Sequence, residues 1–348
     1  MAALIGCFYL LLRKGNAFVS DITSPVRLRR WAATFFAVLF LGHVWWFLFY
    51  LYSNDLHSVS YVVVCVLDIV TMMTTIAGTL FAMLQDRKRH FWPFIIATIP
   101  YAALLGLNIV YPDSYFLIMA FVYILLLYAL FTVYMVFAVR QYGRWLRDNY
   151  ADLEHKEVWL SYMLIIVFSL FVVFYGLADN LTISYILQFI SLALYGLLLW
   201  RVETLQQLDN TTGQDEEEAP EELEEVAISA DSSGIGLLLE RHCEDAQLYL
   251  QHDLSLSQLS QAIGTNHYYL SQYFTQQGMT YNAYINGLRI RHFINLYHEA
   301  VATQRSFTAQ QLANESGFRS YSTFGAAFKQ RMGQTVTAWM RGATEEEK

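Results

Sequence analysis

The sequence predicts an all-α protein in two parts: a polytopic transmembrane helical bundle, followed by a cytoplasmic domain of two helix-turn-helix units. Three features support this prediction: a series of long apolar runs, an acidic segment after them, and two similar amphipathic helix pairs near the C-terminus. We therefore expect a membrane domain at 1–202, a disordered acidic linker at 203–234, the helix-turn-helix domain at 235–342 and an acidic tail at 343–348.

The composition requires much of the chain to avoid water. Charged residues make up 15% of the sequence, against about a quarter in soluble domains, and 55% of the residues are hydrophobic. The three cysteines, Cys7, Cys65 and Cys243, lie far apart and match no metal or redox spacing. We expect free, buried thiols, no metal site and no cofactor.

The membrane domain is predicted from the length of six apolar runs. Each approaches the roughly 20 residues that cross the hydrocarbon core of a bilayer, and aromatic side chains gather near the ends of the runs. Six such runs in succession do not fit the buried helices of a soluble protein. The expected spans are 31–52, 59–84, 91–111, 114–139, 158–176 and 181–200.

A shorter apolar run opens the chain at residues 1–12. Its positive charges, Arg13 and Lys14, follow the run instead of preceding it, so it does not have the form of a secretory signal peptide. A short seventh span and an interfacial segment both remain open.

The basic residues predict the orientation of the spans. All 13 Lys and Arg residues in 1–201 lie before the first long span, in alternate loops or just after the last span, whereas the intervening loops carry none. Cytoplasmic loops are the ones enriched in Lys and Arg. The C-terminal half is therefore expected in the cytoplasm.

The candidates for function within the apolar runs are the ionisable residues His43 and Asp68 and the neutral polar residue Asn108. Ionisable groups inside a bilayer are costly and tend to mark function, so these are candidates for sensing a signal. A structural role for Asp68, in which its hydrogen bonds hold helices together, is equally open. No nucleophile or paired-carboxylate pattern is present, so no enzymatic activity is expected.

Two polar segments connect these parts. The loop 140–157 mixes charged and aromatic residues; it can serve as a contact surface for the C-terminal domain, but a solvated extension of two helices is the favoured interpretation. Residues 203–231 contain eleven acidic residues and no basic ones, which predicts a disordered, self-repelling tether.

Two segments of the last third, 255–274 and 307–328, resemble each other. Each has a short helix with an inward small residue, then a glycine able to adopt positive φ in a tight turn, then a second helix with one apolar face. A polar helix face after such a turn is typical of a recognition helix that enters the DNA major groove. The small residues are Ser260 and Ala313, and the glycines are Gly264 and Gly317.

Five motifs in this region follow one another in order. They are LSQLSQAIG (256–264), YLSQYF (269–274), GMTYNAYINGLRIRHFINL (278–296), QLANESGF (311–318) and FGAAFKQRMGQTVTAWMR (324–341). On these motifs, residues 237–342 resemble the C-terminal domain of the AraC/XylS family of transcription regulators. The membrane half more loosely resembles polytopic relatives of that family in Bacteroidales-type bacteria, through RWLRDNYADLEHKEVW (144–159).

The resemblance implies two helix-turn-helix units joined by a long helix around 282–300, about 28 Å in length. Its recognition helices would enter successive major grooves on one face of the DNA. The base-reading candidates implied by position are His267, Tyr268, Ser271, Gln272, Gln276, Tyr321, Ser322, Gly325 and Ala326. The candidates for phosphate contact are Arg289, Arg291, Arg319, Lys329 and Arg331.

Two departures from the family pattern shape these expectations. Gly325 and Ala326 stand where a longer polar or basic side chain is common, so the first unit is expected to supply most of the base specificity. The domain is also weakly charged, with 9 Lys and Arg against 9 Asp and Glu in 235–348. A homodimer, which tethers two readers together, would compensate for weak binding by one copy.

The leading hypothesis is a membrane-bound, one-component transcription regulator in the bacterial cytoplasmic (inner) membrane. Its expected partners are double-stranded DNA, the lipid bilayer, a second copy of the chain and RNA polymerase; the signal ligand is not specified by the sequence. A transporter or receptor whose C-terminal domain serves protein interaction is the alternative. An intramembrane enzyme with a fused regulator is the more remote one.

Overall fold

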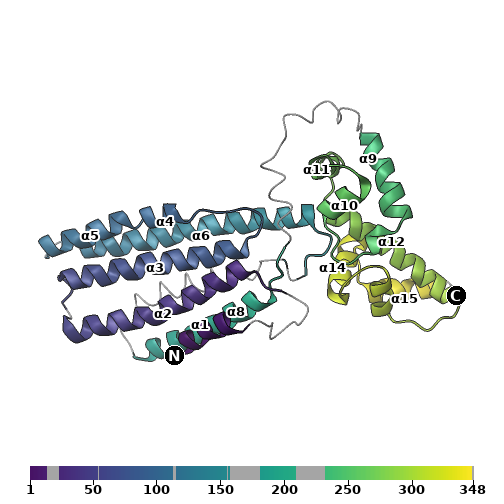
Figure 1. Cartoon of the computed structure of the whole chain (residues 1–348). Coiled ribbons are helices and arrows are strands. Elements are labelled where there is room, and N and C mark those ends of the chain that lie inside the picture. The colour runs from purple at the N-terminus through teal and green to yellow at the C-terminus, as the bar shows by residue number, and fades with distance from the viewer. Residues whose placement is uncertain are drawn as a thin grey trace. The chain divides into compact units, whose positions relative to one another are not determined.

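The computed structural model describes residues 1–13, 23–53, 55–112, 115–154, 156, 181–208 and 232–346 (Figure 1). Within these ranges the chain is all-α and no strand is present, as the sequence predicts. The chain divides into two compact units, each with its own core. The first unit comprises Met1–Tyr142 and His155–Leu208, and the second comprises Gly143–Glu154 and Asp209–Lys348.

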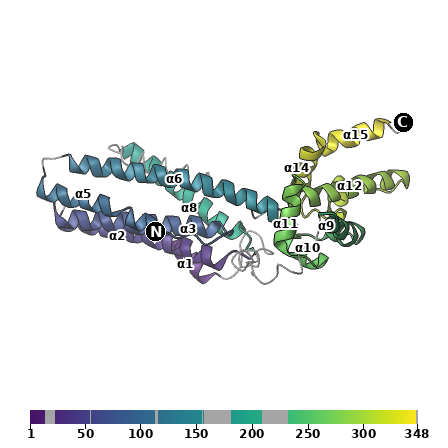
Figure 2. The ribbon, with the colours of Figure 1, turned by 90° about the horizontal axis from the view of Figure 1, so that it is seen from above.

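The helices of the first unit run alongside one another lengthwise (Figures 1 and 2). Among the described residues, four helical segments are long and apolar enough to cross a membrane, and one shorter apolar helix precedes them. The four segments are Val26–Tyr52, Val59–Met83, Trp92–Val110 and Phe116–Asn149. The helices are α1 (Ala2–Leu12), α2 (Val26–Tyr52), α3 (Val59–Met83), α4 (Trp92–Ile96), α5 (Ile99–Val110), α6 (Phe116–Asn149) and α8 (Leu181–Thr204).

Large apolar side chains cover the outside of this unit. Phe47 is 64% exposed, Leu130 is 59% exposed and Phe189 is 75% exposed, and many other Leu, Val and Phe residues point outward with them. Contiguous exposed apolar surface of this kind marks contact with a membrane or a protein, because water does not stabilise it.

The structure interrupts one of the predicted spans. The run 91–111 is not one continuous helix, because α4 ends at Ile96 and α5 starts at Ile99, with Pro100 in the first turn of α5. A proline has no N–H for a helical hydrogen bond, so it favours a helix start at this position. The expected span 158–176 lies outside the described residues, whereas 181–200 forms most of α8.

The first residues of the expected linker belong to the first compact unit. Helix α8 continues to Thr204, and the Glu203 side chain is fully buried, with its Oε1 3.3 Å from an Arg29 guanidinium nitrogen. Gln85 then binds the following residues by donating to the Gln206 carbonyl (2.9 Å) and accepting from the Leu208 N–H (2.9 Å). A buried ion pair and two hydrogen bonds therefore hold this end of the tether.

All three cysteines are free and buried, as expected from their spacing. Cys7 and Cys65 lie in the first unit and Cys243 in the second. No group of His, Cys, Asp or Glu in the described ranges has the arrangement of a metal site.

In the second compact unit, nine helical segments lie between Ser232 and Glu346, and the end of α6 lies with them. A π-helical turn follows the first of these segments, and a 3-10 turn precedes the first helix-turn-helix unit. The segments are α9 (Ser232–Leu239), η2 (Glu240–Asp245), η3 (Leu248–Leu250), α10 (Leu256–Ile263), α11 (His267–Gln276), α12 (Tyr281–Ala302), α13 (Ala309–Glu315), α14 (Tyr321–Met332) and α15 (Val336–Glu346). Helix α9 thus starts three residues before the expected boundary at 235.

Helix α12 contributes to two separate hydrophobic cores. Its N-terminal half places Tyr281 and Ile285 in a core with α10 and α11, and its C-terminal half places Phe293 and Tyr297 in a core with α13, α14 and α15. The partners in the first core include Leu259, Leu270 and Phe274, and those in the second include Leu312, Phe324 and Phe328. One rigid helix therefore joins the two helix-turn-helix units.

The two tight turns repeat the same hydrogen bond. In the first helix-turn-helix unit the Thr265 N–H donates to the Ser260 carbonyl (2.9 Å). In the second helix-turn-helix unit the Phe318 N–H donates to the Ala313 carbonyl (3.1 Å). The intervening glycines adopt φ of 72° at Gly264 and 90° at Gly317, as the sequence predicts. Positive φ closes each turn and directs the next helix away from the first.

We predict that Gly317→Ala destabilises the C-terminal compact unit more than Gly264→Ala does. A left-handed backbone costs about 1–2 kcal/mol for a residue with a Cβ at either site. At Gly317 the Cβ would also lie 2.8 Å from the Leu250 Cα, whereas at Gly264 it meets open space. Overpacking adds about 1–3 kcal/mol at Gly317 alone. Hydrogen exchange of the α12 amides measures both free energies of unfolding, and equal losses would contradict the expected order.

Candidate nucleic-acid interface

Side-chain caps fix the start of both helices in the first helix-turn-helix unit. Ser255 accepts from the Gln258 N–H (3.2 Å) while the Gln258 side chain accepts from the Ser255 N–H (3.0 Å), which is a capping box at the start of α10. Asn266 caps α11 by accepting from the Tyr268 N–H (2.9 Å). The turn and the direction of α11 are therefore set by local hydrogen bonds as well as by Gly264.

Helix α11 buries one face and presents the other. Leu270 and Phe274 are at most 3% exposed, whereas Tyr268 is 66% exposed on the opposite side. The base-reading candidates of this unit share the outward side: Tyr268, Gln272 and Gln276 are exposed, and His267 and Ser271 are partly exposed. The amphipathic arrangement that the sequence predicts for this helix is confirmed.

Helix α14 has the same design with smaller side chains. Ser320 caps it by accepting from the Thr323 N–H (3.3 Å), and Phe324 and Phe328 are fully buried. The candidate residues of this unit are accessible: Tyr321, Ser322 and Ala326 are exposed, and Gly325 is partly exposed. Since neither Gly325 nor Ala326 has a polar side chain, this face offers few groups that can read a base edge.

The length of α12 matches the spacing of DNA grooves. A helix of 22 residues is about 33 Å long, and one turn of B-DNA is about 34 Å. The first core holds α11 against the N-terminal half of α12, and the second core holds α14 against the C-terminal half. This arrangement holds the two candidate recognition helices, α11 and α14, at a fixed separation.

Four of the five basic residues expected at phosphates have accessible side chains. Lys329 and Arg331 are exposed in the last turn of α14. Arg291 is 65% exposed and lies 3.6 Å from Glu244, and Arg319 is 30% exposed and pairs with Asp253 at 2.8 Å. Exposed ion pairs of this kind are weak enough to exchange for a phosphate.

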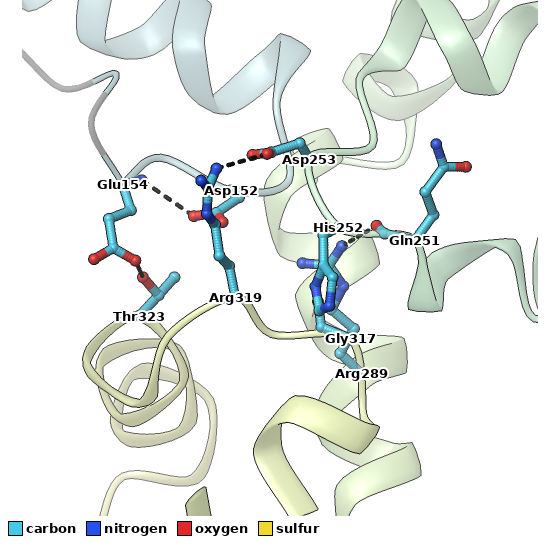
Figure 3. Close-up of polar contacts among 9 residues, drawn as sticks. All are labelled: Asp152, Glu154, Gln251, His252, Asp253, Arg289, Gly317, Arg319 and Thr323. Atoms are coloured by element: carbon cyan, nitrogen blue, oxygen red, sulfur yellow. Dashed lines mark hydrogen bonds and ion pairs between the residues drawn. The ribbon is translucent and has the colours of Figure 1, made fainter. Parts of the chain in front are cut away.

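The fifth, Arg289, is buried, and its position does not support contact with a phosphate. Its side chain is 1% exposed and donates from Nε to the Tyr249 carbonyl (2.7 Å) and from Nη2 to the Gln251 carbonyl (2.8 Å; Figure 3). Burial lowers the pKa of the guanidinium, and the negative charges of Asp152 and Asp253 oppose that shift. Arg289 follows the inward stripe of Tyr281, Ile285 and Phe293 at four-residue spacing, which is the sequence signal that distinguishes it from Arg291.

The three polar candidates of the first compact unit, His43, Asp68 and Asn108, are not hydrogen-bonded to one another in the described part of the chain. The Asp68 carboxylate lies close to Gly42 of α2, where an added Cβ would be 3.3 Å from Oδ1. The exposed His43 ring contacts the Leu39 carbonyl through Nδ1 (2.7 Å). Asn108 is buried, and its amide nitrogen is 3.3 Å from the His57 ring.

The segment 140–157 combines features of both interpretations that the sequence leaves open. Helix α6 extends through Asn149 and keeps Arg144, Arg147 and Asp148 exposed, as a solvated helical extension would. Tyr150, Ala151 and Asp152, in contrast, are at most 6% exposed, and Ala151 belongs to a hydrophobic core of the C-terminal compact unit. These residues therefore contact the C-terminal domain, and a small side chain in a charged loop gives no sign of this burial in the sequence.

Comparisons with known proteins agree with this geometry. Residues 259–342 match a family described as a helix-turn-helix domain. Uncharacterized HTH-type transcriptional regulators of Staphylococcus aureus strains COL and MW2 are 32% identical to the chain over 94 residues. The match covers 27% of this chain and 12% of each relative, so the similarity concerns one domain of much longer proteins. No solved structure matches the chain.

The C-terminal domain is thus an AraC-type helix-turn-helix domain of the kind found in transcription regulators. This result confirms the part of the family resemblance that rests on the five C-terminal motifs. The matched segment begins inside α10 and ends inside α15, so it contains both recognition helices and all of α12.

We predict that Arg289→Ala destabilises the second unit and that Arg291→Ala does not. Loss of the buried guanidinium leaves two main-chain carbonyls without their donor, at a cost of about 3 kcal/mol in total. Arg291 is on the same helix but mostly exposed, and removal of its ion pair costs under about 1 kcal/mol. Chemical unfolding of the full chain, followed through α12 hydrogen exchange, tests the pair. Similar losses in both variants would show that Arg289 is not structural.

Proposed function

We propose that the chain is a membrane-bound, sequence-specific DNA-binding transcription regulator that couples a membrane or envelope signal to gene expression. The observation that carries the proposal is the pair of accessible recognition helices, α11 and α14, held on one helix of about 33 Å. Two readers at this spacing fit successive major grooves. The similarity to HTH-type transcriptional regulators supports the same conclusion.

Sequence reading is assigned mainly to α11. The Gln272 amide can pair with the N6 and N7 groups of adenine, and Tyr268 can contact a thymine methyl group. On α14, Tyr321 and Ser322 are the remaining groups with a polar atom near the start of the helix. This helix serves chiefly to position the domain, with Lys329 and Arg331 contacting phosphates.

The remaining partners follow from the architecture. The four apolar helical segments support a location in the bacterial cytoplasmic membrane, with the DNA reader in the cytoplasm. We expect a homodimer, because one domain with balanced charge binds DNA weakly and tethering of two domains raises the effective concentration. Contact with RNA polymerase completes the proposed mode of regulation.

Sensing is assigned to the polar residues within the membrane unit, with Asp68 as the main candidate. Its carboxylate lies between α3 and the small Gly42 of α2, so a change in its hydrogen bonding would alter the packing of these two helices. A signal that favours one packing over the other shifts the population of states.

We predict that Gln272→Ala changes the base preference of the full chain, while Lys329→Ala weakens binding to all sequences alike. The amide contact is worth about 1–3 kcal/mol of discrimination, whereas loss of one phosphate contact lowers the salt dependence by about one counterion. Selection from a random duplex pool by the chain in lipid nanodiscs, followed by titrations at several salt concentrations, measures both effects. The absence of any sequence preference for the unmodified chain would overturn the proposed function.

A second prediction concerns the membrane signal. Asp68→Asn keeps the shape of the side chain but removes its charge, and we expect altered expression of a reporter placed behind the selected DNA site. Asp55→Asn, at an exposed position outside the helices, is the matched control and should leave expression unchanged. Normal signalling by Asp68→Asn at normal protein levels would restrict Asp68 to a structural role.

A further inference from the structure

The loop that follows α6 packs into the helix-turn-helix domain of its own chain. Ala151 lies in the first core, and its N–H donates to the Leu254 carbonyl just before α10 (3.3 Å). Tyr150 is 6% exposed beside it, and Asp152 is 2% exposed. Residues 149–154, the docked loop, therefore form part of the second unit although they are about a hundred residues distant in sequence.

Two asparagines of α12 hold the main chain of the docked loop. The Asn282 amide donates to the carbonyls of Tyr150 (3.2 Å) and Ala151 (2.6 Å), and the Asn286 amide donates to the Ala151 carbonyl (3.3 Å). Both asparagines lie on α12, the helix that joins the two helix-turn-helix units. The loop is thus recognised by the same element that sets the separation of α11 and α14.

The two ends of the docked loop contact the two recognition helices (Figure 3 shows the second contact). At one end, the His267 ring nitrogen Nε2 lies 2.8 Å from the Asn149 Oδ1 acceptor, at the first residue of α11. At the other end, the Thr323 hydroxyl donates to the Glu154 carboxylate (3.2 Å), at the third residue of α14. The N-terminal residues of a recognition helix are the ones that contact base edges in a major groove.

The charge of this segment opposes DNA. Asp152 and Glu154 of the docked loop and the adjacent Asp148 carry three negative charges, and no Lys or Arg lies between Arg147 and Lys156. The Glu154 carboxylate occupies the start of α14, where a DNA chain would bring its own negative charge. The Glu154 carboxylate and a DNA phosphate cannot occupy the start of α14 together. The docked loop and DNA therefore exclude one another there.

We propose that the docked loop is an intramolecular ligand of the helix-turn-helix domain that competes with DNA and must leave before DNA is bound. This inference rests on the proposed function, because it assigns a regulator to the same interface. Helix α6 is continuous from the apolar run to Asn149, so the loop is attached directly to a membrane-spanning candidate. A shift of α6 would change the loop's docking equilibrium, and with it the fraction of the domain that is free to bind DNA.

One feature of the contact between the docked loop and α12 favours release of the loop. The Asn286 Oδ1 atom is buried and has no hydrogen-bond partner among the described residues, although its amide nitrogen binds the loop. A buried polar atom left unsatisfied lowers the net stability of a contact. An incompletely satisfied interface is suited to a contact that must open.

The first test removes the acidic end of the loop. Glu154→Ala in the full chain in lipid nanodiscs should bind the selected duplex about fivefold to tenfold more tightly, because it loses a hydrogen bond that holds the docked state. Asp148→Ala removes the same charge from an exposed residue next to the loop and should have a smaller effect. Unchanged or weaker binding by Glu154→Ala would overturn the proposal, as would an equal gain in Asp148→Ala.

The second test acts from the side of α12. Asn282→Ala loses two hydrogen bonds to the loop, and we expect an increase of about tenfold or more in affinity for the same duplex. Asn295→Ala, at an exposed position on the same helix, is the matched control and should bind like the unmodified chain. If both asparagine variants gain equally, the effect does not come from the loop.

Hydrogen exchange distinguishes the two proposals. The Ala151 N–H, bound to the Leu254 carbonyl, should be protected without DNA and should exchange faster when the duplex is saturating. Persistent protection with DNA bound would overturn competition and leave the regulator function intact. Failure of the unmodified chain and of both loop variants to bind any duplex selectively would overturn the regulator function and the competition together.

Discussion

The sharing of α12 between two hydrophobic cores is the constraint on which the C-terminal domain depends. Each helix-turn-helix unit is too small to bury its apolar residues alone, and each completes its core with one half of this helix. The Arg289 guanidinium sits between the two halves and binds the carbonyls of Tyr249 and Gln251. Because both cores pack against the same rigid helix, the recognition helices cannot change their separation unless one core unpacks.

The first compact unit has a different kind of surface. Large apolar side chains such as Phe47, Leu130 and Phe189 are exposed on it, as in surfaces that contact a membrane or another protein. The small residues Ala33, Ala77 and Gly78 are buried on α2 and α3, where they let the helices approach closely. The polar contacts of Glu203 and Gln85 occur at the end of α8 and just beyond the end of α3.

The sequence predicted the local elements well, because their causes are local. The inward Ser260, the turn at Gly264 and the apolar face of the following helix all follow from spacing and residue type. The burial of Arg289 was not predicted, and the docking of Ala151 corresponds to the less favoured interpretation of its loop, since both depend on residues far away in the chain. The structure describes four segments that are long and apolar enough to cross a membrane, and the number of spans stays a prediction.

The weak charge of the DNA reader and the docked loop have a common physical explanation. A strongly basic domain would bind DNA phosphates with many contacts, and each contact would add to a salt-dependent attraction that a few hydrogen bonds could not match. With 9 basic and 9 acidic residues in 235–348, the long-range attraction is small. Binding then depends on short-range contacts at α11 and α14, which are the contacts that an acidic loop on the same chain can replace. The proposed control by the loop that follows α6 therefore requires a DNA-binding domain with a net charge near zero.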